Sequence, residues 1–360
     1  MFSFTRHNQT PYQQLVAVLF VVAVAVPRQH VTAGNSVPLP PLITLDTQTA
    51  IDRGLAYLVR TQSREGAWRQ SGAMGQYPVA MTALAGLAFL SNGNTVTQGQ
   101  YAPQVSRAAD FLLSSADPKT GLIWRIEEES RSMYGHGFSM LFLGQLHGME
   151  GDSNKRKRIH RVLQKAVQLT QRSQSEQGGW LYTPDSRGDE GSVTITQLQG
   201  LRSCRNAGVA VPKQVIDGAI GYLEKSALPG GGITYRADRR GEPRPPITAA
   251  AVACWYNAGV YDHPLVEKNL RFVKQQLGRG TNRSATLGHY FYAHFYMAQV
   301  MWLSGKQDWE WYFPAMRDRL LALQEPDGSW QGDHVGKVYG AAIALTILQL
   351  PYRYLPIMQR

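Results

Sequence analysis

The amino-acid sequence predicts an all-α fold, an (α/α)6 toroid in which six helical hairpins form an inner and an outer ring. Three observations predict it. A Gln-x-x-x-Gly-x-Trp motif recurs, amphipathic segments alternate with segments that are apolar all round, and β-strand patterns are scarce. The 360 residues include only two cysteines, so packing rather than a disulfide framework has to stabilise the chain.

The motif marks six units. Its three intact copies are bounded by Gln62 and Trp68, by Gln174 and Trp180, and by Gln324 and Trp330. Degenerate copies end at Trp124 and Tyr235, so the markers recur about every 55 residues as far as Tyr235. The longer interval before Trp330 leaves room for one more unit, whose marker is lost near residues 278–283. An open solenoid is the alternative to a closed ring, and six copies favour closure.

Each unit is predicted to be a helical hairpin. An amphipathic segment comes first, as at 50–60, where Ile51, Leu55 and Leu58 share one side. A segment rich in small and apolar residues follows the Gly-x-Trp turn, as at 79–90. Its wider apolar surface predicts a more buried, inner helix. Twelve helices would therefore form two concentric rings.

The residues of the motif are expected to be structural. A glycine allows the sharp turn out of the first helix, and a tryptophan buries a large ring between units while its N–H finds an acceptor. A glutamine one turn earlier is placed to hydrogen-bond the backbone of the turn. We assign this structural role to Gln62, Trp68, Trp124, Gln174, Trp180, Gln324 and Trp330.

Residues 1–33 have the layout of a secretory signal peptide. A mildly basic start precedes an apolar run at 15–26, and small residues at 31 and 33 suit a cleavage site. This run is shorter than the about 20 residues that span a bilayer. An uncleaved anchor is the alternative. We expect an exported protein, periplasmic or extracellular, with a linker at 34–46, the toroid at 47–350 and a C-terminal tail at 351–360.

The net charge of +11 has a local component. Five cations lie within seven residues: Lys155, Arg156, Lys157, Arg158 and Arg161. Such a run is either a solvated helix face or a contact for an anionic membrane surface. Nucleic acid is not expected as a partner, because the chain has no recognisable binding motif and carries an export signal.

The repeat resembles that of the prenyltransferase and squalene oxidase family, which includes squalene–hopene cyclases and protein prenyltransferase β subunits. The resemblance rests on the three intact motif copies and extends over about residues 47–350. Strings at 134–138, 289–296 and 350–356 look most like exported members from planctomycete-type bacteria. The family implies an (α/α)6 toroid with an apolar central cavity and isoprenoid ligands.

The catalytic motifs of that family do not carry over. Its cyclases use an Asp-x-Asp-Asp or Asp-Cys-Thr-Ala-Glu run as the proton donor, and no such run occurs here. Asp189 and Glu190 form the only adjacent acidic pair near the start of an inner helix, where helix capping is the alternative to acid catalysis. The zinc-binding Asp-x-Cys of the prenyltransferases is reduced to Cys254, and Tyr292 rather than His294 stands at the histidine position. We therefore expect no metal and no cofactor.

Inner-helix starts should converge on one rim of the ring. The candidate catalytic residues there are His136, Asp189, Glu190, Tyr292 and His294, and the candidate cavity-binding residues are Tyr134, His289, Tyr290, Tyr296 and Tyr339. The histidines have no diagnostic metal spacing, and hydrogen-bonded core histidines are the alternative. Cys204 and Cys254 are either a disulfide pair or buried thiols.

Three functions remain open. The first is binding of an isoprenoid or other apolar molecule in the cavity without catalysis, because the catalytic motifs are absent. The second is an active terpenoid cyclase or prenyl-type transferase that uses the His/Asp/Tyr rim. The third is activity on a polysaccharide, for which paired carboxylates across a cleft would be needed.

Overall fold

The computed structural model describes residues 38–70, 75–239, 241–279 and 289–359. The predicted signal peptide, residues 34–37 of the linker and most of the lost marker near 278–283 lie outside them. Within the described residues there are twelve α-helices and no strand. This confirms the predicted all-α fold.

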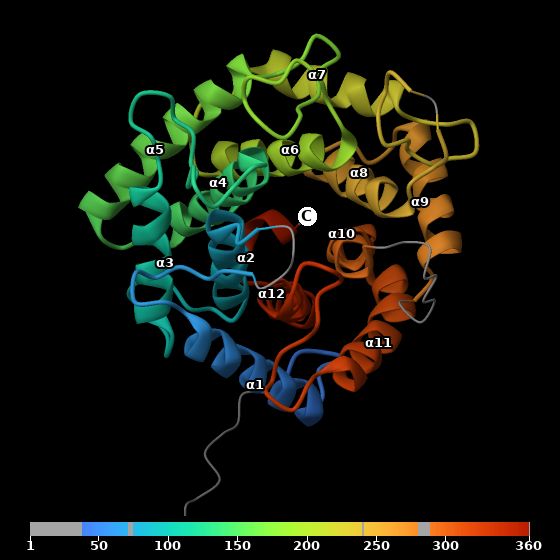
Figure 1. The fold of residues 1–360 in the computed structure, drawn as a ribbon. Helices are drawn as coiled ribbons and strands as arrows, with labels where there is room; N and C mark the ends of the chain where they lie inside the picture. The colour runs from blue at the N-terminus through green and yellow to red at the C-terminus, as the bar shows by residue number, and fades with distance from the viewer. Residues whose placement is uncertain (1–37, 71–74, 240, 280–288, 360) are drawn as a thin grey trace, which may run out of the picture. The chain divides into compact units, whose positions relative to one another are not determined.

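The helices alternate between an outer and an inner ring (Figure 1). The outer helices are α1 (Leu45–Thr61), α3 (Ala102–Ser114), α5 (Ser153–Arg172), α7 (Lys213–Lys225), α9 (Pro264–Leu277) and α11 (Lys306–Leu323). The inner helices are α2 (Pro78–Ser91), α4 (Ser132–Met149), α6 (Gly191–Asn206), α8 (Pro245–Asn257), α10 (Tyr290–Ser304) and α12 (Lys337–Leu348). Each inner helix packs against the next, and α12 packs against α2, so the inner ring is closed.

The two rings differ in burial, as the sequence pattern requires. Every residue of α2 is buried, whereas α5 buries one face that includes Ile159 and Leu163. An inner helix must be apolar all round because it contacts both its ring neighbours and the outer ring. Local signals set the helix starts: Thr44 forms a capping box at α1, and the Asp152 side chain caps α5.

The motif glutamine joins its own turn to the next outer helix. Gln174 Nε2 donates to the carbonyl oxygens of Gly178 (2.8 Å) and of Val215 on α7 (2.9 Å). Gln324 does the same with Gly328 and with Ala50 on α1, at 3.0 and 2.8 Å. The last unit is thereby bonded to the first, and the outer ring closes as well.

The motif tryptophan is completely buried in all three intact copies. The indole Nε1 of Trp180 donates to the Thr170 carbonyl at 2.7 Å, and its backbone N–H donates to Thr194 Oγ1 at 3.0 Å. Trp68 and Trp330 make the same indole contact with the carbonyl oxygen ten residues earlier. The ring therefore packs between the two helices of its hairpin with its polar atom satisfied.

In the two degenerate units an isoleucine occupies the position of the buried tryptophan. Ile123 and Ile233 lie two residues after the turn glycine, are completely buried, and donate their backbone N–H to the following inner helix. Trp124 is only half-buried, and Tyr235 is 38% exposed. The degenerate markers are thus shifted by one or two residues from the positions that the aromatic residues indicated.

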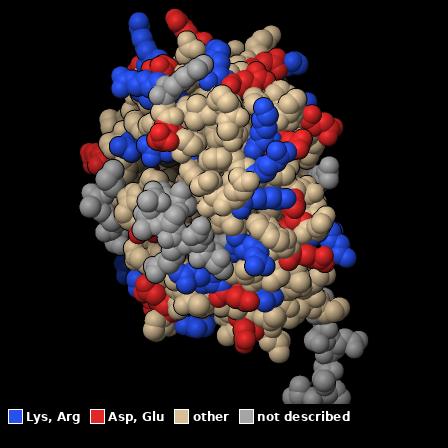
Figure 2. All heavy atoms as spheres, turned by 90° about the vertical axis from the view of Figure 1, so that its right-hand side faces the viewer, with Lys and Arg blue, Asp and Glu red and all other residues tan. Residues whose placement is uncertain are grey.

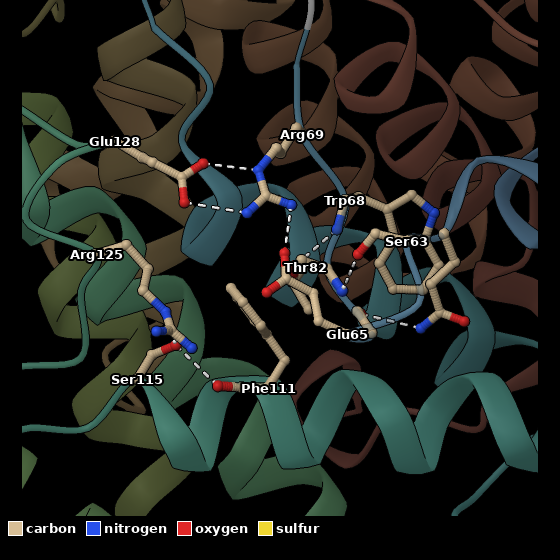
Figure 3. Close-up of polar contacts among 12 residues, drawn as sticks. Ser63, Glu65, Trp68, Arg69, Thr82, Phe111, Ser115, Arg125 and Glu128 are labelled. Carbon is tan, nitrogen blue, oxygen red and sulfur yellow. Dashed lines mark hydrogen bonds and ion pairs between the residues drawn. The ribbon is translucent and has the colours of Figure 1, made fainter.

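Adjacent units are also joined by polar contacts at the turns (Figure 3). Arg69 donates to both carboxylate oxygens of Glu128, at 2.6 and 3.0 Å, and pairs with Glu65 at 2.6 Å. Two parallel N–H···O bonds fix the relative orientation of the first two turns better than a point charge would.

The C-terminal residues form part of the folded unit. The 3-10 helices η2 (Leu350–Tyr352) and η3 (Pro356–Met358) follow α12, and the chain ends near the middle of the ring (Figure 1). Leu355, Ile357 and Met358 are buried, and η3 packs against α6 and α10. The segment predicted as a tail therefore fills the ring at the ends of the inner helices.

Substitution of the turn glycines measures how much the close approach between units limits the structure. Gly178 has φ +96°, and a Cβ there would lie 2.1 Å from the Gly218 carbonyl oxygen on α7. Gly208 also has a positive φ, +77°, but nothing lies within 4 Å of its Cβ position. We expect Gly208→Ala to cost about 1–2 kcal/mol of unfolding free energy through backbone strain alone.

Gly178→Ala should cost about 1–3 kcal/mol more, because α7 has to move away. Chemical denaturation of both variants measures the difference. Equal losses would show that the close approach between units does not limit stability.

Candidate functional site

A cavity of about 750 Å³ lies where the inner helices begin. All six inner helices contribute side chains from their first two turns to its wall. Ala80, Met81 and Leu84 from α2, Phe138 from α4 and Ile247 from α8 make the wall largely apolar. The size falls in the usual range for small-molecule sites.

Tyrosine hydroxyls supply much of the remaining lining. Tyr134, Tyr292 and Tyr339 come from α4, α10 and α12. Burial raises the pKa of each of these phenols well above 10. They stay protonated at neutral pH, so these phenols add no negative charge to the lining.

The cavity receives some of the predicted residues and not others. Among the predicted catalytic residues, Tyr292 lines it; among the predicted binding residues, Tyr134, His289 and Tyr339 do. His136, Asp189, Glu190, Tyr290, His294 and Tyr296 are not part of the lining. The absent residues have other partners, which explain their positions.

His136 lies between α4 and α5. Its Nδ1 accepts from the Ile123 backbone N–H at 3.2 Å, and its Nε2 lies 3.1 Å from Thr170 Oγ1. This is the place that Thr194 takes in the next unit, so the imidazole is a buried partner of the turn. Burial lowers its pKa to about 4, which keeps the ring neutral.

The side chains of α10 divide between the cavity and α11. His294 Nδ1 lies 3.0 Å from Tyr312 Oη on α11, and Tyr290, one turn earlier, donates to Met316 Sδ at 3.7 Å. Tyr292 faces the cavity, while Tyr296, one turn deeper, is completely buried. On the side of α10 that faces the centre of the ring, only the first turn therefore lines the cavity.

Asp189 and Glu190 lie behind the wall. Asp189 Oδ2 accepts from Ser175 Oγ at 2.7 Å. Glu190 is the N-cap of α6: its Oε2 accepts from the backbone N–H of Ser192 at 2.8 Å, and its Oε1 from that of Val193 at 2.7 Å. Tyr134 Oη donates to Glu190 Oε1 at 3.2 Å, so this carboxylate contacts the cavity wall from outside.

Two other carboxylates cap an inner helix of the preceding unit. Glu129 Oε1 accepts from the Val79 backbone N–H on α2 at 2.8 Å, and Asp333 Oδ1 from that of Tyr290 on α10 at 2.8 Å. Burial raises the pKa of Glu129 to about 7 and that of Asp333 to about 6. These acids bind helix starts and not the cavity.

Two arginines line the cavity that the sequence patterns did not single out. Arg131 and Arg244 each directly precede an inner helix, α4 and α8. No acidic residue belongs to the described lining. No sequence pattern marked either residue, because cations are not typical of helix starts.

Other chemistry is not built into the described residues. They hold no cluster of three or more His, Cys, Asp or Glu that would suit a metal ion. Cys204 and Cys254 are separate buried thiols. None of the helices described is long and apolar enough to cross a membrane.

Comparison with known proteins establishes the fold. No protein-family model and no curated protein matches this sequence. The type II terpene cyclase MstE from Scytonema matches with a TM-score of 0.60 and 14% identity, over 86% of this chain and 99% of that chain. A protein from Actinoplanes matches with a TM-score of 0.56 and 18% identity, over 86% and 99%.

A polysaccharide-active enzyme has the same architecture. The GH76A α-1,6-mannanase from Salegentibacter sp. HEL1_6 matches with a TM-score of 0.63 and 8% identity, over 86% of this chain and 99% of that chain. Since identities this low show shared architecture alone, the chain is an α/α toroid like both enzymes. The prenyltransferase-type repeat remains a resemblance.

The buried Glu129 carboxyl makes stability depend on pH. Its pKa is raised from 4.5 in the unfolded chain to about 7, so the folded state binds more protons between these values. Its contribution to stability is complete below about pH 4.5 and is lost as the pH rises through 7. We expect Glu129→Gln to flatten the fall in unfolding free energy over this range.

Denaturation series at several pH values measure this slope. Glu127→Gln, two residues away and exposed, is the matched control and should keep the wild-type slope. Parallel profiles for wild type and Glu129→Gln would contradict the assignment.

Proposed function

We propose that this chain binds an apolar, isoprenoid-sized molecule in its central cavity. The observation that carries the proposal is the cavity of about 750 Å³ itself, which all six inner helices line and whose wall consists mainly of apolar side chains and protonated tyrosines. Such a wall gains free energy mainly by removing apolar ligand surface from water. The tyrosine rings would pack against the ligand.

The structural neighbours support the choice of ligand. Solved structures of MstE hold geranylgeranyl dihydroxybenzoate, its substrate, and merosterolic acid A, its product. A toroid of this architecture therefore accommodates an isoprenoid chain. We carry over the ligand class and not the reaction.

Catalysis is the weaker alternative. A cyclase would need an acid directed at the ligand. The Glu190 carboxyl is bound to the α6 start and contacts the wall through the hydroxyls of Tyr134 and Ser192, without lining the cavity itself. Hydrolysis of a glycan would need two carboxyl groups facing the substrate at a separation of about 5–10 Å. The described lining contains no carboxyl group.

Export and a membrane-surface contact remain proposals. Helix α5 carries seven Lys and Arg residues and no acidic residue, and Lys157, Arg158 and Arg161 are exposed. By contrast, the face over α9 and α11 mixes both signs of charge (Figure 2), with ion pairs such as Lys274–Asp308. This difference supports α5 as the part that would meet an anionic surface.

Mass spectrometry tests the binding proposal directly. Lipid extracts of the full chain, purified without detergent, should contain a polyprenyl or other apolar species at close to one equivalent. Ala80→Phe places a ring in the cavity and should lower the affinity for added farnesol at least tenfold. Ala102→Phe, at the half-exposed start of α3, is the control and should bind farnesol as the wild type does.

Melting curves show whether Ala80→Phe folds, and Val335→Trp, on the loop before α12, replaces it if necessary. An empty wild-type extract together with no farnesol binding would refute the proposal.

A further inference from the structure

We infer that the cavity selects molecules with an anionic end, which Arg131 and Arg244 hold at the mouth while the apolar part lies against the inner helices. This inference rests on the proposed function and adds the chemical class of the ligand: a hydrocarbon chain ending in a carboxylate or phosphate.

The first arginine is held in place without being neutralised. The Arg131 guanidinium lies 4.3 Å from the centre of the Tyr182 ring, and Tyr182 Oη is hydrogen-bonded to Tyr235 Oη. Arg131 and Tyr235 both line the cavity. Stacking on a tyrosine orients the guanidinium but leaves its charge and its N–H groups available.

The second arginine approaches from the α8 side. The Arg244 backbone N–H donates to the Ile233 carbonyl at 2.8 Å, which fixes the start of the helix, and its side chain lines the cavity. Among the described residues, neither Arg131 nor Arg244 has a carboxylate within ion-pair distance. Two cations therefore face one cavity without counter-charges.

Two histidines also lie at the mouth. The rings of His289 and His334 lie 5.2 Å apart, and both line the cavity. Burial, and then the proximity of His334 and Arg244, lower the pKa of His289. The lowered pKa keeps His289 neutral at neutral pH, so the two arginines supply the positive charge of the lining.

The nearby acids are already engaged. Glu129, Glu190 and Asp333 accept hydrogen bonds from helix-start N–H groups, and Glu128 pairs with Arg69. Glu242 lies outside the cavity lining, in a smaller hollow that it shares with Arg236, Arg239 and Arg244, and it forms no ion pair with Arg244 among the described residues. The internal residues not described, 71–74, 240 and 280–288, include no Asp or Glu in the sequence. The described cavity lining therefore holds two guanidinium groups and no carboxyl group.

The ligand class follows from this distribution. A guanidinium binds a carboxylate or phosphate through two parallel N–H···O bonds, and such bonds are stronger than those to a neutral hydroxyl. The apolar wall around Met81, Leu84 and Phe138 takes a chain and offers no partner for a second charge. A cationic head would be repelled by the same mouth.

Four probes with one decyl chain test the head alone: decyl phosphate, decanoate, decanol and decyltrimethylammonium. Calorimetric titration of the full chain at low salt should rank both anions at least tenfold tighter than decanol, with the ammonium probe weakest. The preference should shrink at 0.5 M salt, because it is electrostatic. Comparison of decyl phosphate with decanoate distinguishes a phosphate site from a carboxylate site.

The double variant Arg131→Gln/Arg244→Gln should lose the preference for anions and bind decanol within twofold of wild type. Arg205→Gln/Arg271→Gln removes the same charge from exposed positions on α6 and α9, outside the cavity lining, and should change nothing. Arg244 is exposed, so Arg244→Gln alone keeps the test usable if the double variant does not fold; it should lower the preference at least threefold.

The two proposals fail in different ways. Equal binding of anions and decanol, or an anion preference that survives the loss of both arginines, overturns the headgroup inference and leaves apolar binding intact. Failure of all four probes and of farnesol to bind refutes the cavity function itself.

Discussion

The contact between a turn glycine and a carbonyl oxygen of the next outer helix sets the spacing of the whole ring. At Gly178 the backbone of the turn lies directly against the Gly218 carbonyl of α7, and Gly66, Gly121, Gly231 and Gly328 lie equally close to their neighbours. With the motif glutamine bonded across the same gap, each unit has one permitted distance from the next. Repetition of this step around the ring brings α12 onto α2, and the inner helices enclose the cavity.

The electrostatics of the cavity follow from how helix starts are satisfied. Six inner helices point their N-termini at one end of the ring, and each start has N–H groups that need acceptors. Acids at this end serve as those acceptors, as Glu129 does for α2 and Asp333 for α10. Because these acids bind backbone N–H groups, none of them pairs with the arginines that precede α4 and α8. The capping of the helix starts thus leaves the mouth of the cavity with a net positive charge.

The ring itself could be predicted from sequence, because its signals are local: the spacing of the motif and the alternation of one-sided and fully apolar helices. The lining could not. A helix such as α10 is buried on every side, so its pattern does not say that Tyr292 faces the cavity while His294 faces α11. His136 was misleading because it stands where neighbouring units use threonine, and Trp124 because isoleucine fills the tryptophan place in its unit. Arg131 and Arg244 gave no pattern at all.

The closed ring also determines when the chain can complete its fold during synthesis. Helices α1 and α2 contact their last neighbours only when α11 and α12 have been made, and α12 ends 257 residues after α2 (348 − 91). At about 5–20 residues per second, the first hairpin keeps an apolar face uncovered for roughly 13–51 s. The residues around Ile357 that fill the ring come later still. An incomplete chain therefore has neither a closed wall nor a filled end, so the cavity can admit a ligand only after the two ends of the toroid have met.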